Sequence, residues 1–449
     1  MEYWHTMSEV QASTYKQSVF DEKVLQFCLS VVDFVEVFPA DNELLRRAVL
    51  DAISFCRSME EVAAYLSALK TSLQNKSKFN PSDLLSVAKA VGQDSPAVLY
   101  DFLLTIEKLG VTTHFSHLRD QRGDQGSNQG TKLWSEFFNG VHILVKNQVQ
   151  LADFLNTTRF LCDAEEDSEW EEFFSATKSL QKEKSQSLQD FFTTVRFLAP
   201  TKFPAWSSFY TACKKLSLSN KGEAAFFEAV RHSRHYFLTS QSFQGILRAL
   251  SETPEYSNAL AFGQLDSKKW LIEEALKVWG SAWGNTVFVL AGWVGLLPRM
   301  MYDQNIEVLK VRSFDVDATA NLASESINQV EVQQDWAYKS STQDITQMQY
   351  PATYKVLRKD GSPCELCEMP DVVINTSCEH IADINSWWKQ IPTGTKVILQ
   401  SNNGFHIPEH VACFKNLADF AATMQLSRTD YAGEKDLPEF KRFMLIGVK

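Results

Sequence analysis

Two glycines three residues apart, Gly292 and Gly295, stand between a short apolar run and a segment with helical periodicity. The apolar run, Thr286–Leu290, has the length and character of a buried strand, and a helix is expected over Leu296–Tyr302. Glycine is needed where the backbone turns tightly and passes close to a ligand. Gly292, Trp293 and Gly295 are therefore candidates for contact with a bound cofactor. The alternative is an ordinary strand-to-helix turn, because an isolated glycine pair is a weak signal.

Two acids, Asp315 and Asp317, follow about twenty residues later, at the end of a second expected strand, Val308–Phe314. A carboxylate at that place in an α/β fold accepts hydrogen bonds from both hydroxyls of a ribose. Asp317 also stands where the next helix begins, and an aspartate there caps the helix. Both acids are candidate ligands of a nucleoside, with Asp315 the stronger one.

A third acid, Asp335, is followed by Trp336 after an expected short strand over Gln329–Gln334. A carboxylate after this strand can accept from an adenine amine while an aromatic ring packs on the base. We therefore expect Asp335 and Trp336 to bind adenine, the alternative being a surface turn.

A further polar cluster, Asn375 to His380, follows the expected strand Asp371–Asn375. His380 is a candidate general base with Glu379 and Asn375 around it, and the alternative is that these side chains cap a helix. Cys378 is a candidate on the acceptor side. Addition of its thiolate to a cytosine ring is not favoured, because enzymes that use a cysteine in this way usually have a proline before it, and this chain has Ser377 there.

The next expected strand, Thr395–Gln400, leads to three further acceptor-side candidates, Asn402, His406 and His410. Neighbouring parallel strands end at the same edge of a sheet, so His406 and His410 are expected to converge with His380. A metal site is conceivable from four side chains: Cys378, His380, His406 and His410. We prefer polar contacts between these side chains and an acceptor, and we expect no metal. Cys364 and Cys367 also have zinc-like spacing, but the sequence has no second pair at matching spacing.

The elements that position these residues differ between the two halves of the chain. Residues 1–265 read as successive amphipathic helices without a fixed-period repeat, with a glycine-rich loop near residues 119–131 that separates two possible helical subdomains. From about residue 266 to 449, strands alternate with helices, which indicates a Rossmann-like, doubly wound parallel sheet. A small hairpin is expected around Asp360-Gly361, and a terminal antiparallel hairpin from Ser427–Tyr431 and Arg442–Val448.

Composition limits the partners. The chain has 449 residues and a net charge of −11, so nucleic acid is disfavoured as a partner. Its 8 cysteines form no dense framework, which suits a reducing compartment, and a cytoplasmic location is expected. No signal peptide and no apolar run of about 18 residues is evident, so no membrane association is expected.

Together the first three clusters resemble the class I S-adenosylmethionine-dependent methyltransferases over residues of about 270–449. The resemblance is carried by Val-Phe-Val-Leu-Ala-Gly-Trp-Val-Gly as the glycine loop, Phe-Asp-Val-Asp as the ribose motif and Gln-Asp-Trp as the adenine-side motif. The closing Arg-Phe-Met-Leu-Ile-Gly-Val-Lys resembles the antiparallel last strand of that fold. The glycine loop departs from the family pattern, because it is leaner and lacks the usual preceding acid.

The resemblance implies S-adenosylmethionine as cofactor, with an acceptor that meets the methyl group near His380. The expected function is methyl transfer to a small molecule, a peptide or a protein. Transfer of the aminocarboxypropyl arm of the same cofactor stays open, as does a non-catalytic binding protein. A nicotinamide oxidoreductase is disfavoured by the missing third glycine and the terminal hairpin.

The helical half is larger than a methyltransferase core needs. We expect it to form one wall of the acceptor pocket, with the helix Trp270–Trp279 as a rigid junction. The alternative is a dimerisation or docking module, and a homodimer through this domain is a possible partner arrangement.

Overall fold

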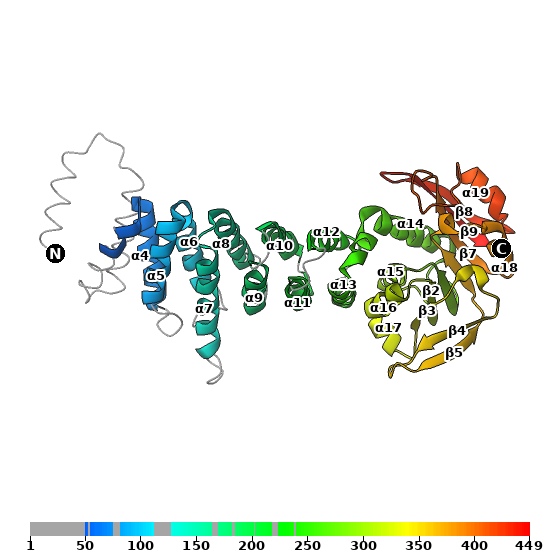
Figure 1. Cartoon of the computed structure of the whole chain (residues 1–449), viewed down its shortest axis with the longest axis horizontal. Coiled ribbons are helices and arrows are strands. Elements are labelled where there is room, and N and C mark those ends of the chain that lie inside the picture. Colours follow the sequence, from blue (N-terminus) through cyan, green and yellow to red (C-terminus); the bar gives the residue numbers. More distant parts are fainter. Residues whose placement is uncertain are drawn as a thin grey trace, which may run out of the picture. The chain divides into compact units, whose positions relative to one another are not determined.

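The computed structural model describes residues 50–52, 54–74, 81–111, 127–163, 169–181, 185–201, 203–217, 223–237 and 239–449 (Figure 1). Its contacts divide the chain into two compact units, residues 1–199 and 200–449. Residues 200–265 therefore lie in the same unit as the sheet, while the predicted domain boundary near residue 265 stays a prediction. The proposed separation of two helical subdomains falls mostly on residues 112–126, outside the described part. Within the described ranges no helix is long and apolar enough to span a bilayer.

The first unit is a stack of helices. Its long helices are α4 (Met59–Gln74), α5 (Pro81–Asp94), α6 (Leu99–Val111), α7 (Ser127–Leu144), α8 (Gln148–Asp163), α9 (Trp170–Gln181) and α10 (Ser185–Leu198). Helices two apart in the chain pack together, since α4 contacts α6, α6 contacts α8, α7 contacts α9 and α8 contacts α10. This pairing produces two rows of helices with an aromatic core between them (Figure 1).

A repeat underlies these helices, contrary to the expectation of none. Each helix from α7 to α13 buries at least one phenylalanine completely, and one such residue recurs every 17 to 19 residues: Phe137, Phe154, Phe173, Phe191, Phe209, Phe226 and Phe243. One helix with its connection cannot bury its own apolar face, so neighbouring helices within each compact unit share a core. The pattern continues into the second unit, through α11 (Trp206–Leu216), α12 (Glu223–Ser233) and α13 (Ser240–Glu252).

In the second unit, helix α13 lies directly on the layer of helices that covers the sheet. A Cβ added to Gly245 would come 2.3 Å from the Ile327 carbonyl oxygen, so only glycine permits this approach. Ser242 Oγ donates to Asp303 at 2.6 Å, and Gln241 donates to Glu331 at 2.9 Å. After α13 come the 3-10 turn η4 (Pro254–Leu260) and helix α14 (Phe262–Trp279), which contacts the terminal hairpin.

The sheet has seven strands in the order β3-β2-β1-β6-β7-β9-β8. The first five in this order are parallel, and β9 runs antiparallel between β7 and β8. The strands are β1 (Thr286–Leu290), β2 (Lys310–Asp315), β3 (Tyr338–Thr342), β6 (Val372–Asn375), β7 (Lys396–Asn402), β8 (Arg428–Asp436) and β9 (Lys441–Val448). The strand order reverses between β1 and β6, where ligands bind in such sheets.

Helices cover both faces of the sheet. One group is α15 (Leu296–Asp303), α16 (Ala318–Ile327) and α17 (Gln329–Gln333), and the other is α18 (Ile384–Gln390) and α19 (Leu417–Met424). A two-stranded sheet of β4 (Ala352–Leu357) and β5 (Pro363–Glu368) joins the second face and is the hairpin expected around Asp360-Gly361. Trp387 and Trp388 are buried in the core of that face.

The predicted fold class is confirmed, with one strand misplaced. The strand expected over Gln329–Gln334 is helix α17, and the third strand is Tyr338–Thr342 instead. The terminal hairpin is present, and its first strand extends to Asp436.

Candidate active site

The glycine loop connects β1 to α15 and is held to the end of β2. Gly292 N donates to the Phe314 carbonyl at 3.0 Å, and Trp293 N donates to Asp315 Oδ2 at 2.8 Å. Ala291 and Trp293 have φ values of 51° and 50°, a left-handed conformation that costs a non-glycine residue about 1–2 kcal/mol. The loop keeps this conformation because the bonds to β2 fix it at the carboxyl edge of the sheet.

Both glycines of the loop are required by the packing of the chain itself. A Cβ on Gly292 would lie 2.1 Å from Ser313 Oγ, and one on Gly295 would lie 2.1 Å from Ser324 Oγ. Gly295 also has a φ of 70° as the N-cap of α15. Their expected contact with a cofactor stays a prediction, since close internal packing already accounts for both glycines.

Asp315 and Asp317 have separate structural roles. Asp315 accepts from Trp293 N through Oδ2 and from Asp317 N, at 3.0 Å, through Oδ1. Asp317 is the N-cap of α16, because its Oδ1 accepts from Thr319 N at 2.9 Å and from Ala320 N at 3.1 Å. Its other oxygen accepts from the Tyr256 hydroxyl at 2.6 Å, and this bond, with those from the helix amides, lowers the pKa of Asp317. Asp315 is thus the acid at the end of β2.

Asp335 and Trp336 are not where the sequence predicted. They lie in the turn before β3, with φ values of 49° and 57°, and the Trp336 carbonyl accepts from Arg312 Nη1 near the start of β2. This is the amino edge of the sheet, opposite the glycine loop, so the structure contradicts their expected position at a shared ligand site. The acid that follows β3 at the carboxyl edge is Asp344, whose Oδ1 accepts from Thr346 N at 2.8 Å.

Asn375 ends β6 beside the glycine loop and is fully buried. Its Oδ1 accepts from Ser377 N at 2.8 Å, while its Nδ2 has no hydrogen-bond partner among the described residues. Cys378 is buried in the core of the second face, and burial raises the pKa of its thiol. Asn375 therefore keeps one buried donor without a partner among the described residues, and Cys378 is not accessible as an acceptor-side group.

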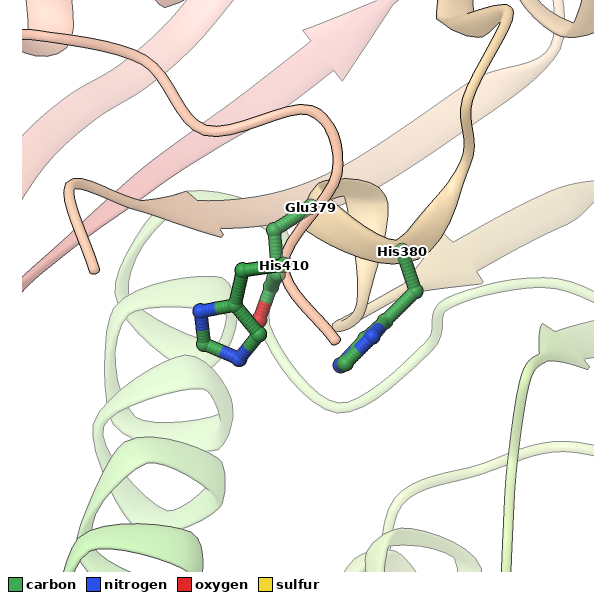
Figure 2. Close-up of side chains that lie close together, drawn as sticks. All are labelled: Glu379, His380 and His410. Atoms are coloured by element: carbon green, nitrogen blue, oxygen red, sulfur yellow. The ribbon is translucent and has the colours of Figure 1, made fainter. Parts of the chain in front are cut away.

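Glu379, His380 and His410 converge as the sheet topology predicted for the two histidines (Figure 2). One ligand atom from each lies within 4.8 Å of the others, and the two imidazole centroids are 4.9 Å apart. Glu379 is 2% exposed, and its Oε1 accepts from Arg442 Nη1 at 2.9 Å. The predicted His406 is exposed and outside this group, and the predicted Asn402 is buried, accepting from Gly404 N at 2.8 Å.

Two basic residues near this group were not singled out from the sequence. Arg442 is the second residue of β9, is 4% exposed and pairs with Asn402 in the sheet register. Lys268 in α14 is partly buried, and burial, with Arg442 nearby, lowers its pKa to about 7. No local motif marks either residue, because each reaches the site through tertiary packing.

A cavity of about 560 Å³ lies beside these residues. It is lined by α12, by the segment from Ser257 to Gln264 and by the tip of the β8–β9 hairpin, where Phe440 and Arg442 contribute. Phe440 packs on His410 with ring centroids 5.9 Å apart. The cavity therefore adjoins the Glu379, His380 and His410 group at the carboxyl edge of the sheet.

Comparison with models of protein families finds no match, and comparison with curated proteins finds no similar sequence. Several solved structures match at low identity. NodS, an N-methyltransferase from Bradyrhizobium japonicum WM9 in complex with S-adenosyl-L-homocysteine, is 10% identical with a TM-score of 0.32, over 46% of this chain and 98% of that one. Magnesium protoporphyrin IX methyltransferase (ChlM) from Synechocystis PCC 6803 with bound SAM is 15% identical with a TM-score of 0.27, over 52% and 96%. An rRNA methylase from Escherichia coli is 13% identical with a TM-score of 0.28, over 57% and 99%.

The fold assignment depends on this chain's own sheet. This sheet has five parallel strands, with the strand order reversing between β1 and β6, followed by the antiparallel β9. A glycine loop follows β1, and an acid stands at the end of β2. The C-terminal domain has the class I S-adenosylmethionine-dependent methyltransferase fold. Within that fold, the glycine loop, Asp315, Asp344 and Asn375 follow β1, β2, β3 and β6 at the carboxyl edge of the sheet, and Glu379, His380 and His410 lie at the same edge.

Proposed function

We propose that the chain is an S-adenosylmethionine-dependent methyltransferase. The observation that carries the proposal is the hydrogen bond from Trp293 N to Asp315 Oδ2, which fixes the loop after β1 and the acid after β2 together. A carboxylate held there, beside the switch point, is placed to accept from the hydroxyls of a ribose.

The side chains around this point fit the cofactor. Each Asp315 oxygen accepts one backbone N–H and retains a lone pair for a ribose hydroxyl. Asp344 takes the adenine-side role that the sequence assigned to Asp335. The buried Nδ2 of Asn375 offers a donor with no partner among the described residues. The cofactor, when bound, supplies an electrophilic methyl group on a sulfonium.

The acceptor enters the 560 Å³ cavity beside His410, a volume in the range of small-molecule sites. Its lining includes Glu228 and Glu439, whereas its one arginine, Arg442, is already paired with Glu379. A negatively charged lining repels phosphate groups, so a neutral or cationic acceptor on a small molecule, peptide or protein is favoured over nucleic acid.

His380 and Lys268 supply the basic groups near the acceptor. His380 Nδ1 lies 2.9 Å from the Glu409 carbonyl and donates to it, so Nε2 of the neutral ring carries the free lone pair. With a pKa of about 7, Lys268 is partly neutral at physiological pH. The shared effect of these groups is to ease loss of a proton from the acceptor as it attacks the methyl group.

Calorimetry with S-adenosylhomocysteine on the full chain tests cofactor binding, and absence of binding by the wild type overturns the proposal. A panel of amines, hydroxylated small molecules and peptides then identifies an acceptor, and product mass separates methyl from aminocarboxypropyl transfer. His380→Ala is expected to lower turnover by about 10²-fold or more with cofactor affinity unchanged. His406→Ala, an exposed histidine of the same loop as His410, is the matched control. Equal turnover in both variants removes His380 from the mechanism.

A further inference from the structure

Three side chains with metal-binding chemistry surround one point at the acceptor side (Figure 2). Glu379 and His380 belong to the 3-10 turn η6 (Cys378–His380) after β6, and His410 belongs to the loop after β7. Two imidazoles and one carboxylate are the ligand set of many first-row transition-metal sites, including catalytic zinc sites.

The two loops are connected by hydrogen bonds next to these ligands. Ala412 N donates to the Glu379 carbonyl at 2.8 Å, and His380 Nδ1 donates to the Glu409 carbonyl at 2.9 Å. The second bond orients the ring and leaves Nε2 as the atom able to bind a metal. Metal-binding histidines are held in this way by a carbonyl or carboxylate on the other nitrogen.

The carboxylate has a spare oxygen. Glu379 Oε1 accepts from Arg442, but Oε2 is buried and has no hydrogen-bond partner among the described residues. A buried carboxylate oxygen without a partner is unfavourable. A cation bound to Oε2 would satisfy it, whereas Arg442 bonds only to Oε1.

We propose that Glu379, His380 and His410 bind one divalent first-row transition-metal ion, with Zn²⁺ as the representative case. Tetrahedral ligands at 2.0–2.2 Å from zinc are about 3.4 Å from one another. The three ligand atoms lie within 4.8 Å of each other, so small side-chain rotations close the site. Three protein ligands leave at least one coordination position open, next to the cavity that Phe440 and Arg442 line.

The role of this ion, which rests on the proposed methyltransferase function, is to bind the acceptor atom and lower its pKa. An acceptor hydroxyl bound to the ion would lose its proton to solvent more readily. Its oxygen would then attack the methyl carbon of the sulfonium, so that the C–O bond forms as the C–S bond breaks and S-adenosylhomocysteine leaves with the electron pair. His380 then acts on the acceptor through the ion, with its Nε2 lone pair on the metal.

The test uses the full chain, freed of metal by dialysis against a chelator and titrated with Zn²⁺ by calorimetry and with Co²⁺ by visible absorption. We expect one ion per chain, bound through nitrogen and oxygen. His380→Ala and His410→Ala should each weaken binding about 100-fold or more. His406→Ala, four residues before His410, should change it less than about 2-fold.

Two further variants test whether cysteines bind the ion and whether the carboxylate is a ligand. The Cys364→Ser/Cys367→Ser variant should bind as the wild type does, and a thiolate-to-cobalt absorption band that it abolishes would assign the ion to those cysteines and overturn the proposal. Glu379→Gln keeps the side-chain shape but removes the anionic ligand, and its thermal unfolding shows whether the loss of the Arg442 pair unfolds the chain. If it does, the metal affinities of His380→Ala and His410→Ala still decide whether this group binds the ion.

The outcomes separate this inference from the proposed function. S-adenosylhomocysteine binding without saturable Zn²⁺ or Co²⁺ binding overturns the metal site alone. Metal binding without S-adenosylhomocysteine binding overturns the methyltransferase function alone. Unchanged metal affinity in His410→Ala refutes the assigned ligands.

Discussion

Asp315 and Asp317 are two residues apart and chemically identical, yet only Asp315 is proposed to bind the ribose. The decisive perturbation is to replace each by asparagine, which keeps size and one carbonyl oxygen. Asp315 joins the glycine loop to the turn after β2 through both of its oxygens. Asp317 uses its oxygens for the α16 amides and for the Tyr256 hydroxyl.

The expected magnitudes differ for the two variants. An asparagine at 315 has one acceptor oxygen instead of two, loses the charge and must leave either a ribose hydroxyl or a loop amide without an acceptor. Charge-assisted hydrogen bonds contribute about 1.5–3 kcal/mol, which corresponds to about a 10- to 150-fold weaker Kd. Asparagine is as good an N-cap as aspartate, so Asp317→Asn should change Kd by less than about 3-fold.

Calorimetric titration of S-adenosylhomocysteine into the wild type and both variants measures these values. Urea unfolding of the same samples separates lost affinity from lost stability. The assignment of Asp315 is refuted if Asp317→Asn weakens binding as much as Asp315→Asn does, or if Asp315→Asn binds with the wild-type Kd.

Three further predictions follow from the packing. Arg442→Leu leaves the Glu379 carboxylate buried without its ion pair and should lower the free energy of unfolding by about 3–5 kcal/mol. Adding Glu379→Leu should recover most of that stability. Urea unfolding of both variants measures this, and a double variant no more stable than the single one contradicts the prediction. Lys268 has a pKa lowered from 10.5 to about 7, so between these values the unfolded chain binds the extra proton and stability rises with pH. The difference in unfolding free energy between wild type and Lys268→Met, followed from pH 7 to 10, should show this rise, and a flat difference would refute it. Gly292→Ala should destabilise the fold by about 1–3 kcal/mol, because its Cβ would lie 2.1 Å from Ser313 Oγ. Adding Ser313→Ala should relieve this clash. Thermal unfolding of the single and double variants tests the contact.

The sequence predicted most of the sheet because apolar runs with breakers on both sides are characteristic of buried parallel strands. β1, β2, β6 and β7 were located in this way, as was the terminal hairpin. The third strand was misplaced because Val-Glu-Val alternates like a strand, although Glu331 there makes a buried ion pair with Arg299 at 2.8 Å. The true strand has a polar sequence whose buried members have specific partners, since Lys339 pairs with Glu325 at 3.1 Å and Ser340 Oγ donates to the Asn321 carbonyl at 3.0 Å. Hydrophobic periodicity cannot detect such a strand.

Errors in the candidate site follow from the same cause. Once the third strand was placed too early, the acid after it was sought at Asp335 and Asp344 was overlooked. The convergence of His380 and His410 was predictable, because it needs only the rule that parallel strands end at one edge. The contributions of Lys268 and Arg442 were not predictable in this way, since no local pattern indicates which part of a helix or hairpin will face the ends of the strands.

Residues of the helical segment before the sheet contact the candidate site and line its cavity. α14 provides Lys268, the segment from Ser257 to Gln264 lines the cavity, and Tyr256 bonds to the N-cap of α16. α13 approaches α16 so closely that only glycine fits at position 245. Removing residues before 266 would therefore expose the helix layer of the sheet as well as open the cavity. The helices of residues 200–265 thus line the cavity that is proposed to receive the acceptor. This favours the hypothesis that they form a wall of the acceptor pocket over the hypothesis of a separate docking module.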